Sequence, residues 1–277
     1  MALKITVLVE DSPGTNPILK FEHGLSFFIQ KDGHVMLFDT GQSGVFLDNA
    51  RHLGIDMSKL DFVVLSHGHY DHSGGFRALC EISSGFQLVT GKGFFVEKYS
   101  VKEAEHTFKG NNFNKDFLEK KGIVRKVMKD TITELVPGVF AVTHFYKDNT
   151  DEVSNSAYKL YDGSMFRKDP FTDEILLAID TPKGLVVLVG CSHPGIKNML
   201  DTVLSALNRP LYAVLGGIHL IEASEERINS TINYFKKSGI RHLGTCHCTG
   251  EKAQNKLKSL GERFMEVKTG SRFSVAW

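Results

Sequence analysis

The ten residues from Ser66 to Gly75 hold three histidines and one aspartate within six positions: His67, His69, Asp71 and His72. They follow directly on the apolar run 62–65, which is typical of a buried strand. Side chains at such a strand end lie where open α/β sheets build their sites. Neutral imidazoles and a carboxylate suit Zn²⁺ and similar first-row metals. A metal site therefore explains this loop better than a polar loop that is merely rich in histidine.

The spacing His67-x-His69-x-Asp71-His72 resembles the signature of the metallo-β-lactamase superfamily. The resemblance implies that His67 and His69 bind one metal, and that Asp71 and His72 bind a second about 3.5–4 Å away. Phe38-Asp39-Thr40-Gly41 resembles the superfamily's first motif, a strand end whose aspartate supports the metal loop. Four further segments resemble the branch of metal-dependent hydrolases related to an archaeal dihydropteroate synthase, a pterin enzyme: 22–26, 190–196, 216–220 and 246–250.

The resemblance extends from about Leu3 to the C-terminus and implies an α/β fold, the metallo-β-lactamase αββα sandwich. In this sandwich two mixed sheets pack face to face with helices outside. We expect a single domain over residues 1–277. A charged cap or insertion is expected around 97–131, and a long loop around 144–173. Long loops within compact domains are usually functional lids or simply mobile.

The sequence patterns predict where the elements lie. Apolar and alternating runs predict strands at 5–9, 26–30, 34–38, 61–65, 175–179, 185–189, 211–215, 242–245 and 272–275. Helical patterns cover 44–53, 75–80, 195–207, 224–238 and 250–260. Asp32-Gly33 between two apolar runs is a standard hairpin signal.

The remaining metal ligands are expected at other strand ends. His193 follows the buried run 185–190, and His247 ends the strand before the last, where the superfamily usually places its final histidine ligand. His144 is the alternative to His193 for the third histidine of the first metal, or a residue that touches substrate. His219 is assigned to substrate contact, with a buried, hydrogen-bonded histidine as the equal alternative. His23 has the same ambiguity.

Cys191 is the clearest departure from the superfamily pattern. Many members place an aspartate after the corresponding glycine, where it bridges two metals, whereas Gly190 is followed here by cysteine. A thiolate can bridge metals, bind one metal, or lie nearby as a thiol. Cys191 is thus a further candidate ligand. Cys246 and Cys248 flank His247 and could themselves clamp a metal. No second cysteine pair completes a structural four-cysteine site, so His247 is the favoured ligand.

Composition and charge limit the classes of molecule that the protein is expected to bind. Lysine plus arginine total 33 and aspartate plus glutamate 32, so the net charge of +1 argues against a nucleic-acid partner. No apolar run reaches the 18–20 residues or so of a membrane span, and no signal peptide is evident. Four cysteines form no dense disulfide framework, which suits a reducing cytoplasm. We expect a small-molecule substrate, and leave assembly into a homo-oligomer open.

The ligand set implies a metal-dependent hydrolase with one or two Zn²⁺ ions, Mn²⁺ or Fe²⁺ being alternatives. The expected nucleophile is a metal-activated water, since metals lower the pKa of water from about 15.7 toward 7. Asp71 is the predicted catalytic residue, because it would hold one metal and orient that water. The expected substrate is an ester or phosphoester. A pterin-related synthase that releases pyrophosphate and a non-catalytic metal-binding sensor are the alternative functions.

Overall fold

The computed structural model describes residues 2–103 and 105–277. Met1, the first residue of the expected domain, and Ala104, within the expected cap, lie outside the described residues. The chain divides into two compact units. Unit 1 comprises Met1–Lys129, Asn155–Asp173 and Lys268–Ala276, and unit 2 comprises Asp130–Ser154, Glu174–Val267 and Trp277. Each unit has its own seven-stranded mixed sheet.

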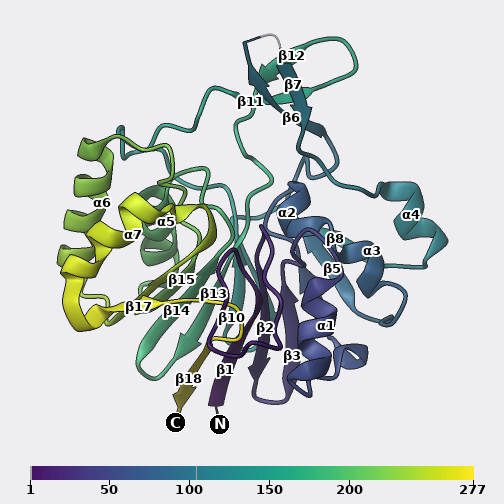
Figure 1. The fold of residues 1–277 in the computed structure, drawn as a ribbon, viewed down its shortest axis with the longest axis horizontal. Helices are drawn as coiled ribbons and strands as arrows, with labels where there is room; N and C mark the ends of the chain where they lie inside the picture. Colours follow the sequence, from purple (N-terminus) through teal and green to yellow (C-terminus); the bar gives the residue numbers. More distant parts are fainter. Residues whose placement is uncertain (1, 104) are drawn as a thin grey trace. The chain divides into compact units, whose positions relative to one another are not determined.

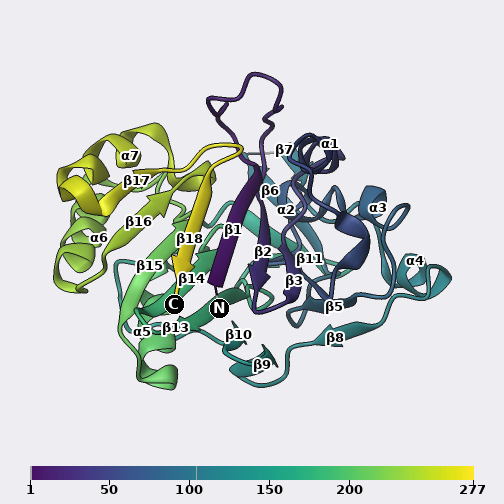
Figure 2. The ribbon, with the colours of Figure 1, turned by 90° about the horizontal axis from the view of Figure 1, so that it is seen from below.

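The large sheet of unit 1 has the order β18-β1-β2-β3-β4-β5-β8 (Figure 2). Its strands are β1 (Ala2–Val9), β2 (Ser26–Lys31), β3 (His34–Phe38), β4 (Phe62–Val64), β5 (Gln87–Thr90), β8 (Arg125–Val127) and β18 (Arg272–Ala276). The pairs from β18 to β3 are antiparallel, and those from β3 to β8 are parallel. The carboxyl ends of β3 and β4 therefore share one edge, where Asp39 and the histidine-rich loop emerge.

Local sequence explains the β2–β3 hairpin. Lys31 pairs with His34, so Asp32 and Gly33 form a two-residue turn. Both have positive φ, 51° and 90°. A tight turn with left-handed residues at both central positions matches the right-handed twist of the strands, and Asp-Gly is among the pairs that adopt it most readily. The predicted hairpin is confirmed.

The helices of unit 1 are α1 (Val45–His52), α2 (Tyr70–Ser73), α3 (Phe76–Leu79) and α4 (Lys115–Lys120), with a 3₁₀ turn η1 at Met57–Lys59 (Figure 1). Of these, α1 and α3 pack on the large sheet. Phe46 and Phe76 are fully buried in a cluster with Leu37 of β3. Because α2 starts within the metal loop and α3 follows it, their burial fixes the loop at the sheet edge.

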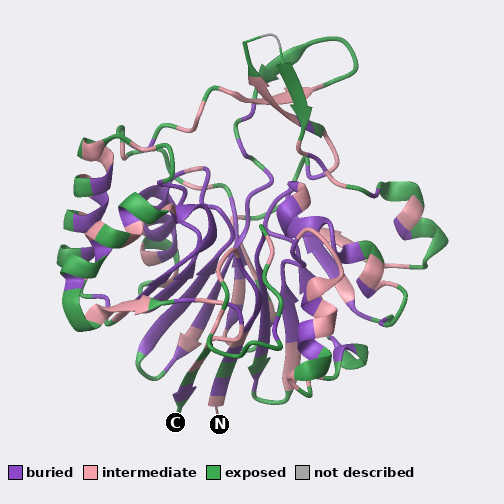
Figure 3. Ribbon diagram, viewed as in Figure 1, coloured by how far each residue is buried: buried purple, intermediate pink, exposed green. Residues whose placement is uncertain are grey.

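A second, four-stranded sheet in unit 1 has the order β12-β11-β6-β7. Its strands are β6 (Glu97–Lys102), β7 (Glu105–Phe108), β11 (Tyr158–Tyr161) and β12 (Phe166–Lys168). We call it the small sheet. Every described residue of β7 and β12 is exposed (Figure 3). The expected cap 97–131 and the expected loop 144–173 thus each contribute one hairpin to the small sheet, whereas β8 joins the large sheet.

The sheet of unit 2 has the order β17-β16-β15-β14-β13-β10-β9. Its strands are β9 (Ile132–Val136), β10 (Val139–Val142), β13 (Leu176–Thr181), β14 (Gly184–Val189), β15 (Leu211–Gly216), β16 (His242–Thr245) and β17 (Phe264–Glu266). Strands β14, β15 and β16 are parallel neighbours. Its helices are α5 (Ile196–Leu207), α6 (Glu225–Lys237) and α7 (Glu251–Leu257), with 3₁₀ turns η2 (His247–Thr249) and η3 (Lys258–Arg263). Helices and strands share one buried apolar cluster.

Two mixed sheets with flanking helices confirm the predicted α/β fold class. Each expected strand and helix is present, with bounds that differ by a few residues. The prediction missed short strands, among them β5, β7, β12 and β17, which have three or four residues each. The single-domain organisation stays a prediction. Across residues 2–103 and 105–277, no helix has the length and apolar character needed to span a membrane.

Candidate metal centre

Asp39 holds the histidine-rich loop of unit 1. Its Oδ1 accepts a hydrogen bond from Ser66 N at 2.6 Å, and its Oδ2 accepts one from Ser66 Oγ at 2.7 Å. The same Oδ2 lies 2.7 Å from His72 Nδ1, and both side chains are fully buried. A carboxylate on Nδ1 makes that atom the proton donor and leaves Nε2 with its lone pair. The expected role of Asp39 as a support of the loop is confirmed.

His67 is fully buried, and both of its ring nitrogens lie close to neighbouring side chains. Ser66 Oγ lies 2.9 Å from its Nδ1, and its Nε2 lies 2.9 Å from Nδ1 of His69. Burial, and then the nearby His72 and His69, lower the pKa of His67 well below its ordinary value. A neutral imidazole is the form that binds metal, so the donors of this loop fit a divalent ion.

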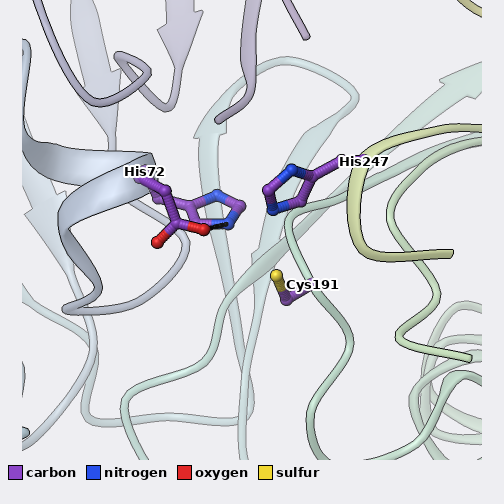
Figure 4. A group of neighbouring side chains, drawn as sticks. His72, Cys191 and His247 are labelled. Carbon is purple, nitrogen blue, oxygen red and sulfur yellow. Dashed lines mark ion pairs between the residues drawn. The ribbon is translucent and has the colours of Figure 1, made fainter. Parts of the chain in front are cut away.

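Asp71 lies between two histidines of unit 1. Its Oδ2 is 3.7 Å from His72 Nε2 and 3.3 Å from His23 Nε2 (Figure 4 shows His72). The other ring nitrogen of His23, Nδ1, lies 2.9 Å from Asp11 Oδ2. Asp71 is buried, whereas the side chain of His23 is about half exposed. The arrangement forms a chain of groups, Asp11–His23–Asp71, that leads from the surface to the loop.

A buried lysine network supports the same loop from the other side. Lys98 Nζ of β6 lies 2.9 Å from Asp169 Oδ2 and 3.1 Å from Asp173 Oδ1. Asp173 Oδ2 accepts a hydrogen bond of 2.8 Å from the backbone nitrogen of Gly68, between the two first histidines. The small sheet is thereby tied to the metal loop by one fully buried cation.

Two aromatic rings flank His69. Tyr158 of β11 has its ring centroid 5.5 Å from that of His69, and Phe171 has its centroid 5.9 Å away. Phe171 is buried, while Tyr158 is partly exposed. The small sheet therefore presents an accessible ring beside a candidate metal ligand.

Glu174 has a similar supporting role in unit 2. Its carboxylate accepts hydrogen bonds from Ser192 N at 2.7 Å and from His193 N at 3.3 Å. Ser192 has a φ of 63°, in the left-handed region that non-glycine residues seldom adopt. Such strained residues collect at functional sites, where surrounding contacts hold them. The turn after β14 thus fixes Cys191 and His193.

Candidate ligands gather at the ends of neighbouring strands in unit 2. Cys191 and His247 offer ligand atoms within 4.8 Å of each other (Figure 4), and Cys191 and His193 do the same. The rings of His193 and His219 have centroids 4.3 Å apart. Burial alone would raise the pKa of the Cys248 thiol, but hydrogen bonds with Cys191 and His219 lower it well below its ordinary value.

The structure places the expected site residues in two sets. His67, His69, Asp71 and His72 lie together in unit 1, and His193, His219, His247 and Cys191 lie together in unit 2. His144 is exposed and belongs to none of the potential ligand groups found among the described residues.

Sequence reasoning missed several supporting residues. They are Asp11, Lys98, Tyr158, Asp169, Asp173 and Glu174. The one available signal was the acidic pair Asp173-Glu174, which lies directly before a predicted strand. Asp39 and the metal loop also lie at strand ends, but after the strand.

These features assign the chain to a protein superfamily. The strand-end aspartate, the histidine-rich loop it holds and the two mixed sheets define a metallo-β-lactamase fold. The model of the metallo-beta-lactamase superfamily matches residues 19–84, which include Asp39 and the whole loop. The chain belongs to the metallo-β-lactamase superfamily and is an enzyme of that class.

Two relatives match nearly the whole chain. A 7,8-dihydropterin-6-methyl-4-(beta-D-ribofuranosyl)-aminobenzene-5'-phosphate synthase of Methanocaldococcus jannaschii is 36% identical, over 97% of this chain and 95% of its own. The crystal structure of Tm1679, a metal-dependent hydrolase of the beta-lactamase superfamily, is 33% identical, covers 99% of both chains and has a TM-score of 0.86. A diphosphatase of the PhnP family is 14% identical with a TM-score of 0.60, and shares the fold. The predicted superfamily is confirmed.

Proposed function

We propose that the protein is a metal-dependent hydrolase of a small-molecule ester or phosphoester. The observation that carries the proposal is the loop His67-x-His69-x-Asp71-His72, which Asp39 fixes through Ser66 and His72. Metal-ligating histidines usually donate a hydrogen bond from the ring nitrogen that does not bind the metal, and a carboxylate is a common acceptor.

The proposed ligands for up to two ions are His67, His69, Asp71, His72, His193 and His247, with Cys191 as a further candidate. Zn²⁺ suits this mixture of imidazole, carboxylate and thiol donors best, and Mn²⁺ and Fe²⁺ are the alternatives. Bound divalent ions supply Lewis acidity, which lowers the pKa of water and stabilises developing negative charge.

The chain's own groups would orient and move protons. Asp71 would orient the attacking water and accept its proton, since it is the carboxylate of the loop that also faces a second histidine. His23, which contacts both Asp71 and Asp11, would pass that proton to solvent. The half-exposed position of His23 suits this role.

The substrate class is suggested by Tyr158. A partly exposed ring beside His69 favours a substrate with a planar ring, because aromatic rings stack on one another. The relative that is 36% identical is named for a dihydropterin product, so a pterin-related synthase is the second candidate function. In that reaction the metals would bind a pyrophosphate leaving group.

The first experiment is elemental analysis of freshly purified protein, followed by assays on aromatic phosphodiesters, lactones and pterin precursors. We expect one or two transition-metal ions per chain and hydrolysis that chelation abolishes and zinc restores. Hydrolysis that survives chelation, or no metal after reconstitution, would refute the proposal. Release of pyrophosphate from a pterin precursor would favour the synthase. Metal binding without turnover of any substrate would favour the sensor.

The compartment and partners belong to the same proposal. None of the four cysteines, all of which lie in the described residues, forms a disulfide, and Cys191 must stay reduced to bind a metal, which suits a reducing cytoplasm. A small molecule is the proposed substrate, and neither nucleic acid nor a membrane is part of the proposed reaction. Assembly into a homo-oligomer would be tested by light scattering of the purified protein.

A further inference from the structure

Three adjacent parallel strands of unit 2 are each followed by a buried residue of a type that binds metals. Cys191 follows β14, His219 follows β15, and Cys248 lies in η2 after β16. Carboxyl ends of parallel neighbours meet at one edge of the sheet, so the three side chains start from the same place. Sequence spacing hides this group, because its members lie far apart in the chain.

The three ligand atoms converge. Cys191 Sγ, Cys248 Sγ and a ring nitrogen of His219 all lie within 4.8 Å of one another. The side chains are nearly inaccessible, with exposed fractions of 3% for Cys191, 7% for Cys248 and 8% for His219. A zinc ion bonds sulfur at about 2.3 Å and nitrogen at about 2.0–2.1 Å. Two ligand atoms of one zinc ion therefore lie no further apart than the 4.8 Å found here.

The backbone is shaped to allow the convergence. A Cβ atom on Gly217 would lie 2.6 Å from Cys248 Sγ and 2.5 Å from the carbonyl oxygen of Gly190. Only glycine therefore leaves room for the sulfur. His219 is held at a φ of 45°, an uncommon conformation for a residue other than glycine. Gly217 thus leaves space for the sulfur of Cys248, and the backbone conformation of His219 places its ring nearby.

We propose that Cys191, His219 and Cys248 together bind one thiophilic divalent ion, with Zn²⁺ as the best fit. Cys191 would then bind this ion rather than a hydrolytic ion, for which it is also a candidate ligand. Two thiolates would neutralise the charge of the ion in a buried place, and a neutral imidazole would complete three protein ligands. Two cysteines and one histidine are a ligand set that zinc enzymes use, with a fourth position left open. The proposal involves residues of unit 2 alone.

Binding requires the cysteines to lose their protons. The Cys248 thiol lies 3.5 Å from the carbonyl oxygen of Cys191, to which it donates a weak hydrogen bond. On binding, the ion replaces each thiol proton, which passes to solvent, so no oxidant or reductant takes part.

The chain offers a matched control. Cys246 is fully buried, two residues before Cys248, but stands outside the group. Cys246→Ser and Cys248→Ser make the same chemical change at neighbouring buried positions. An effect that depends only on a buried thiol would appear in both variants, whereas loss of a metal ligand would appear in Cys248→Ser alone.

The test uses the full chain loaded with Co²⁺, whose thiolate complexes absorb in the near ultraviolet through sulfur-to-cobalt charge transfer. The background is the double variant His67→Ala/His69→Ala, which lacks two of the four proposed hydrolytic ligands of the first loop. We expect the thiolate band to persist there, to fall by about half in Cys248→Ser because one of two thiolates is lost, and to stay unchanged in Cys246→Ser. A band that is absent, or that Cys248→Ser leaves intact in a folded protein, would overturn the site.

Zinc-edge X-ray absorption of the fully loaded wild-type protein keeps the test independent of any variant's folding. Two sulfur ligands per chain at about 2.3 Å support the site, and one or none overturns it. The outcomes also separate the two proposals. A thiolate band without hydrolysis of any substrate would refute the hydrolase and leave this site standing. Hydrolysis without two sulfur ligands would do the reverse.

Discussion

The Nζ atom of Lys98 lies 3.1 Å from Oδ1 of Asp173, and each side chain is only 2% exposed. Asp173 also holds the backbone of Gly68, so the ion pair belongs to the support of the metal loop. Burial disfavours the charge of Lys98, but Asp173 and Asp169 outweigh it and raise the pKa of the lysine. Two buried carboxyl groups therefore share one cation, Lys98.

Lys98→Met should destabilise the protein strongly, because it leaves two buried carboxylates without their cation. We expect the free energy of unfolding to fall by about 3–5 kcal/mol, measured by urea denaturation in the presence of a chelator. Lys121→Met is the control, since its pair with Glu81 is much more exposed and should contribute about 0–1 kcal/mol. Equal losses in the two variants would contradict the role of the triad.

Asp71→Ala should remove a metal ligand and the group that orients water. We expect turnover to fall by roughly a hundredfold or more while the fold survives, judging from typical losses at metal and acid–base positions. Circular dichroism and initial rates on an aromatic phosphodiester would measure both. Asp56→Ala, an exposed carboxylate in a surface turn, is the control and should keep its activity. Near-native turnover in Asp71→Ala would remove Asp71 from the mechanism.

Glu152 should make stability depend on pH. Burial raises the pKa of this carboxyl from 4.5 to about 7, against the opposing charges of Arg227 and Lys197. The folded protein thus holds the proton more tightly than the unfolded chain. The resulting stability is fully present below about pH 4.5, is lost as the pH rises through 7, and amounts to about 3 kcal/mol.

Glu152→Gln keeps the shape of the side chain without the titration. Between pH 5 and pH 8, metal-free wild-type protein should lose more unfolding free energy than Glu152→Gln does, as measured by urea denaturation at each pH. A chelator is needed because metal binding is itself pH dependent. Parallel pH profiles for both proteins would show that Glu152 ionises normally.

Tyr158→Ala should weaken the binding of aromatic substrates. A lost ring contact of about 0.5–1.5 kcal/mol corresponds to a KM roughly two- to tenfold higher, with kcat little changed. Tyr158→Phe should retain the ring contact and the KM. Tyr161→Ala is the control, because Tyr161 lies three residues along β11 and so points to the opposite face of the small sheet. Identical KM values for all variants would exclude Tyr158 from the substrate site.

Cys191→Asp should shift metal preference toward harder ions such as Mn²⁺, because a carboxylate replaces a soft sulfur donor. Competition between Zn²⁺ and Mn²⁺, followed by elemental analysis, would measure the shift. Cys191→Ser should instead weaken binding of both ions. A zinc-to-manganese ratio that Cys191→Asp leaves unchanged would mean that the sulfur contacts no metal.

The parts of the site that could be predicted from the sequence are those whose residues are close in the chain. Four ligand-type residues in six positions after an apolar run could be recognised without tertiary information, and Asp39 was identified by its motif. The Asp173–Gly68 hydrogen bond could not be foreseen, because its partners are 105 residues apart. The grouping of Cys248 with His219 could not be foreseen for the same reason, because these residues follow different strands.

The fold shows a similar division. Buried strands such as β14 have six consecutive buried residues, so their apolar runs were plain in the sequence. The strands β7 and β12 are exposed throughout and have no alternating pattern. Their pairing rests on backbone hydrogen bonds and on ring contacts between strands, such as Tyr99 with Phe108 and Tyr161 with Phe166. Neither can be recognised from the pattern of one strand alone.

The pairing of β18 with β1 has a consequence for synthesis on the ribosome. Residues Ala2–Thr6 pair with Arg272–Ala276, so β1 lies beside a strand that is made much later. While the chain grows, the outer edge of β1 keeps its backbone donors and acceptors open, a state that invites pairing with other chains. The sheet of unit 2 ends at β17 (Phe264–Glu266) and so has all its strands before β18 is made. While residues 272–276 are still missing, β1 therefore lacks one of its two partner strands, whereas every strand of the unit 2 sheet already has its neighbours.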